Sequence, residues 1–228
     1  MGTSVGMLPF ADRRTAGRLL AEELKGLYHE RTVVLGLPRG GVAVAREVAR
    51  LLDAPLDVIV TRKIGYPVQP ELGVGAIAEG GAGPVYDDGL LKRLGLTPED
   101  LTGVVAAEEA ELARRIRVYR GDRPLPDVAG RGVIVVDDGL ATGVTARAAL
   151  RSLRAAGARS VVLAVPVAPP SAAETMRGEA DQVVFLATPR LFSSVGEWYT
   201  SFGQLSDADV LALLTPEQDR GRLPPSMG

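Results

Sequence analysis

The sequence predicts an α/β fold, in which an open, mostly parallel and twisted sheet has helices on both faces. Short apolar runs alternate along the chain with longer segments that carry apolar residues at helical spacing. Such alternation favours parallel strands, because each intervening helix returns the chain across one face of the sheet. The 228 residues are enough for one domain of this kind with additions.

The helices and strands can be placed in chain order. The first helix is expected over 12–28, because Asp12 is a plausible N-cap and leucines recur on one face. The breaker-poor segment 98–119 predicts a helix of roughly 30 Å, at about 1.5 Å per residue. Other helices are expected over 41–52, over 147–156 before Gly157, and between the last two strands. Strands are expected over 32–37, 56–61, 74–78, 85–86, 133–136, 160–165 and 182–187.

The composition excludes several kinds of protein. With a net charge of −2, we expect no general affinity for nucleic acid or for anionic membranes. The absence of cysteine excludes disulfides and thiolate sites, and with His29 as the single histidine a histidine-rich zinc site is excluded too. No apolar run reaches the roughly 18 residues of a membrane span, and no leader-like apolar segment opens the sequence. A cytoplasmic protein is therefore expected.

The most informative segment is VIVVDDGLATGVT, which runs from Val133 to Thr145. A buried-strand pattern ends in two carboxylates, Asp137 and Asp138, and a loop of small residues then leads into a helix. Free N–H groups at a helix N-terminus suit a phosphate, and paired carboxylates suit sugar hydroxyls or Mg²⁺. The loop comprises Gly139, Leu140, Ala141, Thr142, Gly143, Val144 and Thr145.

This segment resembles the motif of type I phosphoribosyltransferases that binds 5-phosphoribosyl 1-diphosphate (PRPP). The resemblance extends over roughly residues 32–187. It implies that Asp137 and Asp138 brace the ribose hydroxyls and share Mg²⁺, while residues 139–145 hold the 5′-phosphate. It also implies a core over 1–190, with a mobile loop and helical insertion over about 65–125, and a hood over 191–218. A disordered tail is expected over 219–228. The alternative is an ordinary strand-to-helix turn with an aspartate N-cap.

A second candidate loop, Pro38-Arg39-Gly40-Gly41, directly follows the first strand. Ligands of open α/β sheets bind at the carboxyl ends of the strands, and an arginine there can grip a phosphate with two hydrogen bonds. The segment resembles the family's pyrophosphate loop, which makes Arg39 a candidate catalytic residue. A simple turn with an exposed arginine is the alternative.

The third candidate is the pair Arg62 and Lys63, which follows the second predicted strand. It resembles the basic pair that meets the diphosphate in adenine and orotate phosphoribosyltransferases; a solvated basic turn is the alternative. The Gly- and Pro-rich stretch 65–83 resembles the family's mobile loop. Of its two acids, Glu71 and Glu79, we take Glu71 as the candidate proton-transfer group.

Two further candidates rest on weaker patterns. The basic end of the long predicted helix contains Arg117 and Arg120. Either these cations stabilise the helix terminus, or one of the two reaches the diphosphate when the mobile loop closes. Trp198, the only tryptophan, and Tyr199 lie where the family builds its base-binding hood. One of these rings would stack on a planar acceptor, Trp198 over the anomeric face of the sugar; packing in a core is the alternative.

The resemblance implies a Mg²⁺-dependent enzyme of nucleotide metabolism that transfers the phosphoribosyl group to a nucleobase-like or other nitrogen acceptor and releases pyrophosphate. Ala141 stands where some 6-oxopurine enzymes carry a catalytic carboxylate, which argues against hypoxanthine or guanine. A non-catalytic PRPP-sensing protein of the same fold is the main alternative, and a phosphosugar hydrolase or carrier a lesser one. A homodimer is possible.

Overall fold

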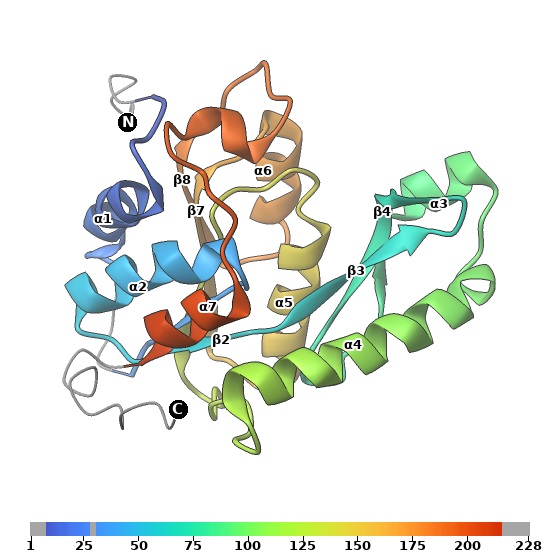
Figure 1. The fold of residues 1–228 in the computed structure, drawn as a ribbon, viewed down its shortest axis with the longest axis horizontal. Coiled ribbons are helices and arrows are strands. Elements are labelled where there is room, and N and C mark those ends of the chain that lie inside the picture. The colour runs from blue at the N-terminus through green and yellow to red at the C-terminus, as the bar shows by residue number, and fades with distance from the viewer. Residues whose placement is uncertain (1–7, 28–30, 216–228) are drawn as a thin grey trace, which may run out of the picture.

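The computed structural model describes residues 8–27 and 31–215, so His29 and the predicted tail at 219–228 lie outside the described residues. Its core is a five-stranded sheet in the order β2-β1-β6-β7-β8, in which every pairing is parallel. The predicted parallel sheet is therefore confirmed (Figure 1). The strands are β1 (Val33–Gly36), β2 (Leu56–Val58), β6 (Gly132–Val136), β7 (Ser160–Val167) and β8 (Gln182–Ala187).

Helices cover both faces of this sheet, as predicted (Figure 1). Because side chains alternate along a strand, Val133 and Val135 face one layer, and Ile134 and Val136 face the other. The first layer contains α5 (Val144–Ala155) and α6 (Pro170–Arg177), and the second contains α1 (Arg13–Leu24) and α2 (Gly40–Leu52). The Asp12 side chain caps α1 by accepting the N–H of Thr15 at 2.7 Å.

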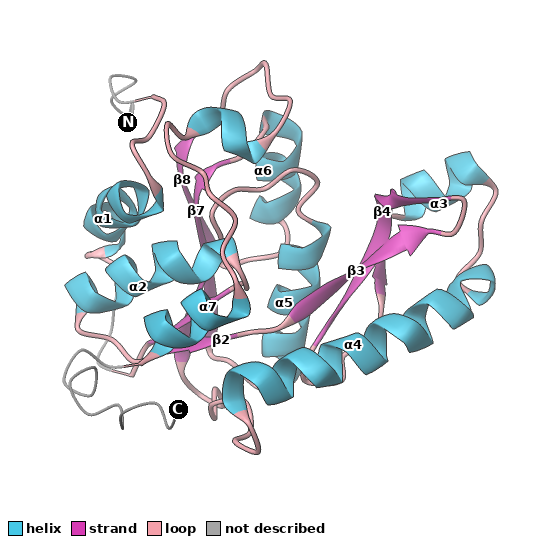
Figure 2. Cartoon of the chain, viewed as in Figure 1, coloured by secondary structure: helices cyan, strands magenta, loops and turns pink. Residues whose placement is uncertain are grey.

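An arm projects from the core between β2 and β6 (Figure 2). It is an antiparallel sheet of β3 (Thr61–Tyr66), β4 (Gln69–Ala78) and β5 (Val85–Tyr86), with α3 (Asp88–Leu94), a 3₁₀ helix (Glu99–Leu101) and α4 (Thr102–Arg120). Two predictions are corrected. The strand expected over 56–61 ends at Val58, because the chain leaves the core sheet there, and the expected loop at 65–83 consists largely of paired strands.

The chain after β8 closes over the carboxyl end of the sheet. It contains a 3₁₀ helix (Val195–Trp198) and then α7 (Asp207–Leu214), which packs against α2 and α4. Ser206 caps α7 and forms a reciprocal capping box with Asp209, a local signal that the sequence reading overlooked. The boundaries expected at 190 and 218 stay predictions. Among the described residues, no helix has the length and apolar character required to cross a bilayer.

Candidate phosphoribosyl-binding site

The predicted phosphate loop leaves β6 and enters α5 at the carboxyl edge of the sheet. The N–H of Leu140 donates to the carbonyl of Val167 at 3.0 Å, and the Leu140 and Val144 side chains are buried in the core. These two residues can therefore offer a ligand only their backbone. Gly143 has a φ of +76°, and a Cβ there would lie 3.2 Å from Met176 Cε, so this position requires glycine.

The first turn of α5 is available to a ligand. Ala141 and Thr142 are exposed, and Thr145 is half-buried. Gly143 is the N-cap, and it has no side chain to satisfy the free N–H groups of the first turn. Only a long contact of 3.5 Å joins Thr142 Oγ1 to the N–H of Val144. This end of the helix can consequently receive an anion, as the motif predicts.

The two predicted loops lie in direct contact. β1 and β6 are neighbouring parallel strands, and the N–H of Leu37 donates to the carbonyl of Val136 at 2.9 Å. A Cβ on Gly40 would overlap the carboxylate of Asp138. A Cβ on Gly41 would lie 2.7 Å from the Val136 carbonyl oxygen and 2.8 Å from Asp137 Cα. The absence of side chains at these glycines thus lets the 38–41 loop reach the acidic pair.

The structure adds a residue that the sequence reading missed. Arg13, at the start of α1, donates from Nε to Asp138 Oδ2 at 2.8 Å and from Nη1 to the Gly203 carbonyl at 2.9 Å. Its guanidinium carbon lies 3.8 Å from the centre of the Phe202 ring. Nothing in the local pattern distinguishes Arg13 from Arg14, so only the tertiary structure identifies it.

Burial and the neighbouring charge of Asp138 raise the pKa of Asp137 well above its usual range. The Asp137 carboxylate accepts the N–H of Asp138 at 2.8 Å, and Asp138 is paired with Arg13. Two crowded carboxylates in a partly buried site are suitable ligands for a hard cation, which they would share. In the described ranges, no cluster of three or more histidine, cysteine or acidic residues is suited to hold a metal ion. The two carboxylates could therefore bind a metal ion only together with oxygen atoms from a ligand and from water.

Arg39 is exposed at the same edge of the sheet. Within residues 8–27 and 31–215, its guanidinium has no hydrogen bond or ion pair. Burial and a hydrogen bond to Asp207 raise the pKa of Tyr119 on α4 to about 12, while the charges of Arg115 and Arg39 oppose that rise. The charge of Arg39 therefore acts on Tyr119 near the C-terminal end of α4, and its guanidinium is available to an anionic ligand.

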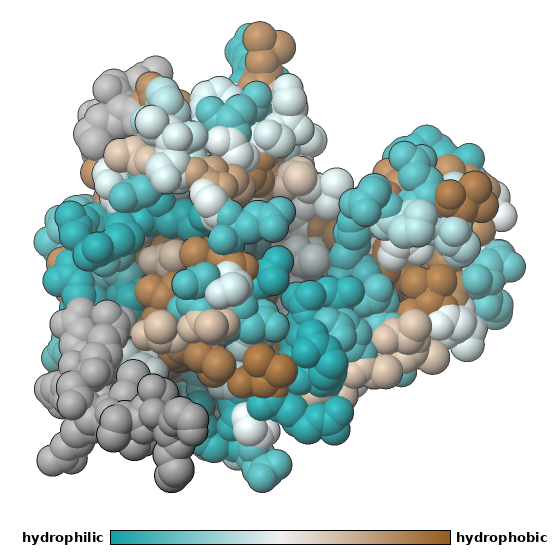
Figure 3. Space-filling model, viewed as in Figure 1, coloured by the Kyte–Doolittle hydropathy of each residue, from teal (hydrophilic) through white to brown (hydrophobic). Residues whose placement is uncertain are grey.

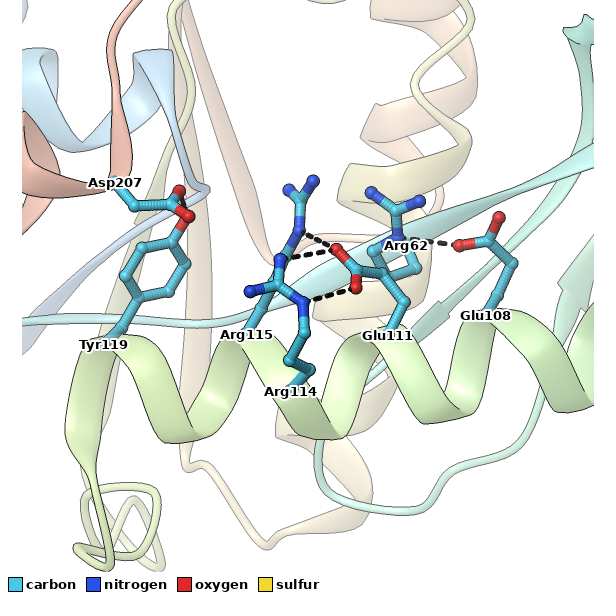
Figure 4. Close-up of polar contacts among 7 residues, drawn as sticks. All are labelled: Arg62, Glu108, Glu111, Arg114, Arg115, Tyr119 and Asp207. Atoms are coloured by element: carbon cyan, nitrogen blue, oxygen red, sulfur yellow. Dashed lines mark hydrogen bonds and ion pairs between the residues drawn. The ribbon is translucent and has the colours of Figure 1, made fainter.

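The basic pair and Glu71 lie in the arm. Arg62 on β3 donates to Glu108 on α4 at 2.7 Å, and Figure 4 shows its guanidinium on the same side of α4 as that of Arg115. Lys63 Nζ donates to the Glu71 carbonyl at 2.8 Å. Arg62, Lys63 and Glu71 line a cavity of about 460 Å³ between the hairpin and α4, and no residue of the phosphate loop lines it. The cavity of the arm is thus separate from the phosphate loop, and Figure 3 shows a notch between the arm and the core.

The structure contradicts a ligand-binding role for Arg120. Its side chain is 1% exposed, and it forms an ion pair with Glu79, which is 4% exposed. Arg120 Nη1 also donates to the Val58 carbonyl at 2.9 Å. The guanidinium is therefore enclosed by protein groups and does not face a ligand. Glu79, which was expected in a mobile loop, directly follows β4 and is the buried partner.

Trp198 lies within the hood, where its ring packs against aromatic and apolar side chains. Its ring stacks on Phe192, with centroids 6.3 Å apart, and it packs in an apolar cluster with Phe10 and Tyr199. Tyr199 bonds the motif directly, and Phe202 contacts Arg13, the partner of Asp138. Tyr199 Oη donates to the Asp138 carbonyl at 2.6 Å, and Phe202 stacks on Arg13. This geometry favours the packed-aromatic alternative for Trp198.

A parallel α/β core with an acidic pair directly before a glycine-turned helix N-terminus is the kind of protein that can bind a phosphorylated sugar. The sequence model of the phosphoribosyl transferase domain matches residues 13–187, so the chain belongs to the phosphoribosyl transferase family. The sequence-based resemblance is confirmed.

Individual relatives agree with this assignment. A Mycobacterium tuberculosis protein whose name places it among the phosphoribosyl transferases is 49% identical over 205 residues, covering 90% of this chain and 46% of the relative. The uracil phosphoribosyltransferase of Lacticaseibacillus paracasei is 32% identical over 146 residues, covering 59% of this chain and 67% of that protein. The crystal structure of TT1426 from Thermus thermophilus has a TM-score of 0.76 and 45% identity, covering 90% of this chain and 97% of that one. The chain spans about half the length of the M. tuberculosis relative, 46%.

Proposed function

We propose that this chain binds PRPP and transfers its phosphoribosyl group to a nitrogen acceptor, with release of pyrophosphate. The observation that carries the proposal is the contact between two loops from neighbouring strands. Gly40 and Gly41 of one loop lie against Asp137 and Asp138 of the other. The groups proposed to bind the diphosphate and the ribose thereby lie close together, as a substrate with both parts requires.

In this reaction the bond from C1′ of the ribose to the diphosphate oxygen breaks. A bond from C1′ to the acceptor nitrogen forms, and the acceptor loses a proton. The leaving group gains negative charge, which Arg39 is placed to neutralise. The free N–H groups at the start of α5 would hold the 5′-phosphate, and Asp137 and Asp138 would hold the ribose hydroxyls. Lys63 and Arg62 could join the diphosphate only if the arm approached the core.

Mg²⁺ fits the same site. Asp137 and Asp138 would hold it together with ligand oxygens. Its charge would neutralise the diphosphate and offset the burial and the repulsion from Asp138 that raise the pKa of Asp137. The proton-transfer group is a separate matter. Glu71 is 96% exposed and its carboxylate is 3.9 Å from Lys63 Nζ, so it too would require movement of the arm. Glu71 stays the candidate proton-transfer group, provided that the arm moves toward the core.

The experiment is a titration of the chain with PRPP and Mg²⁺ by calorimetry, followed by a pyrophosphate-release assay with candidate acceptors. Uracil comes first, since a relative is named for that base. PRPP binding with acceptor-dependent pyrophosphate release would support the enzyme. Binding without turnover for any base would favour the PRPP-sensing alternative, and absence of binding would exclude both. A cytoplasmic location and a homodimer stay predictions.

A further inference from the structure

We propose that Arg13 is a positioning residue for the ribose of the ligand. It holds the Asp138 carboxylate in place for a ribose hydroxyl and joins the hood segment 199–203 to the same carboxylate. This inference rests on the proposed function and deepens it, because it assigns a role to a residue outside both predicted loops.

The contacts of Arg13 form a bridge between three parts of the chain. Its guanidinium joins the start of α1 to Asp138 and to the carbonyl of Gly203, and one face of it lies on Phe202. The Arg13 and Asp138 side chains are only 11% and 15% exposed, so water screens their attraction weakly. A planar guanidinium can bond in two directions and stack at once, which a lysine ammonium cannot.

The hood also contacts Asp138 and its neighbour Gly139 at two further points. Tyr199 Oη donates to the Asp138 carbonyl at 2.6 Å, and Val195 fills the space in which a side chain at position 139 would lie. Arg13 is thus part of a set of contacts that align the acidic pair with the hood. A movement of the hood would therefore displace the acidic pair, and a movement of the acidic pair would displace the hood.

The hydrogen bonds indicate that Arg13 supports the Asp138 carboxylate and does not block it from a ligand. Arg13 bonds Oδ2 of Asp138, and the Asp138 N–H bonds Oδ1 of Asp137. The Asp137 and Asp138 carboxylates also lie within hydrogen-bonding distance of each other. A ribose hydroxyl would therefore meet a pair of adjacent carboxylates, one of which Arg13 holds in place.

The same helix supplies an internal comparison. Arg14 and Arg18 both pair with Glu47 on α2 at 3.2 Å, and their side chains are 68% and 54% exposed. These are ordinary ion pairs between adjacent helices and lie outside the site. Arg18→Gln is therefore a matched control, because it makes the same chemical change on the same helix.

The test measures binding of PRPP, ribose 5-phosphate and inorganic pyrophosphate, each with Mg²⁺, to the full chain and to Arg13→Gln, Arg13→Lys and Arg18→Gln. We expect Arg13→Gln to weaken PRPP and ribose 5-phosphate by about tenfold or more, as loss of a charge-assisted hydrogen bond implies. Pyrophosphate, which has no ribose, should change less than about twofold. Arg13→Lys should fall between, and Arg18→Gln should match the unmodified chain for all three ligands.

Equal losses for all three ligands, or unchanged or tighter PRPP binding by folded Arg13→Gln, would overturn the assignment. If Arg13→Gln does not fold, as judged by circular dichroism, Arg13→Lys decides by the same ratio of ribose to pyrophosphate losses. Absence of PRPP binding by the unmodified chain would instead defeat the proposed function, and this inference with it.

Discussion

Arg120 and Glu79 form an ion pair that is almost fully shielded from water where the arm joins the core. Arg120 ends α4 and Glu79 follows β4, and both also bond the crossing segment. Arg120 Nη1 donates to the Val58 carbonyl at 2.9 Å, and Glu79 Oε1 accepts the N–H of Val60 at 2.7 Å. Burial lowers the pKa of Arg120, which shows that desolvation opposes the charged pair. The pair therefore fixes how the arm leaves the core.

Replacing one partner should destabilise the fold. We expect Glu79→Gln to cost about 3–5 kcal/mol of the free energy of unfolding, since it leaves Arg120 buried and uncompensated. Urea denaturation measures this change. The exposed pair Arg177–Glu174 supplies the control, and Glu174→Gln should cost less than about 1 kcal/mol. Equal effects of the two substitutions would contradict the structural role of the pair.

The contact between the two loops predicts a strict requirement for glycine. Gly41→Ala should abolish measurable PRPP binding, because its Cβ would press on the backbone of Val136 and Asp137, which cannot move independently. Gly103→Ala on α4 is the control. No atom lies within 4 Å of its added Cβ, and alanine should stabilise the helix by up to about 1 kcal/mol. Calorimetry and thermal melts distinguish the two results. Normal PRPP affinity in Gly41→Ala would argue against the shared site.

Tyr119 should give the protein a stability loss at high pH. Burial and the 2.6 Å hydrogen bond to Asp207 raise its pKa to about 12 from an unfolded value of 10. Because the folded state keeps this proton more tightly, the stabilisation is complete below pH 10 and is lost as the pH rises toward 12. Phenolate absorbance should show a step near pH 12 that Tyr119→Phe removes. A Tyr119→Phe difference spectrum with its step near pH 10 would contradict the buried hydrogen bond.

Arg39 should act on the diphosphate and not on the 5′-phosphate. We expect Arg39→Ala to weaken PRPP and pyrophosphate by about tenfold or more, as for loss of a charge-assisted contact, and ribose 5-phosphate by less than about twofold. Lys63→Ala should show the same selectivity only if the arm closes, because Lys63 now bonds Glu71. Calorimetric titrations with the three ligands measure both. A loss of ribose 5-phosphate as large as that of PRPP would refute the assignment of Arg39.

Trp198 should matter more for stability than for PRPP. Its ring is packed against Phe192 in the hood cluster, so Trp198→Ala should cost roughly 3 kcal/mol of unfolding free energy. PRPP affinity should stay within about twofold. Its emission offers a second measurement, since it is the only tryptophan. A large change of emission on adding a candidate base would restore Trp198 as an acceptor contact.

The sequence alone was enough for the parallel sheet, its layers and the two site loops. The apolar run 133–136, the acids at 137 and 138 and the glycine turn at 143 are local signals, because strand and turn preferences depend on neighbouring residues. The order of residues in the motif also indicated the phosphoribosyltransferase family, and the match of the family model to residues 13–187 confirms it.

Only the tertiary structure decided the partners of the charged side chains. Arg120 and Arg39 are both arginines that the sequence offers to a diphosphate. Arg120 is enclosed with Glu79, whereas Arg39 is exposed in the loop whose glycines contact the acidic pair. Arg13 and Asp138 are 125 positions apart and meet only because α1 packs on the sheet to which β6 belongs. Whether a charged side chain is exposed or paired depends on its burial and on residues that are distant in the sequence. The local sequence pattern determines neither of these.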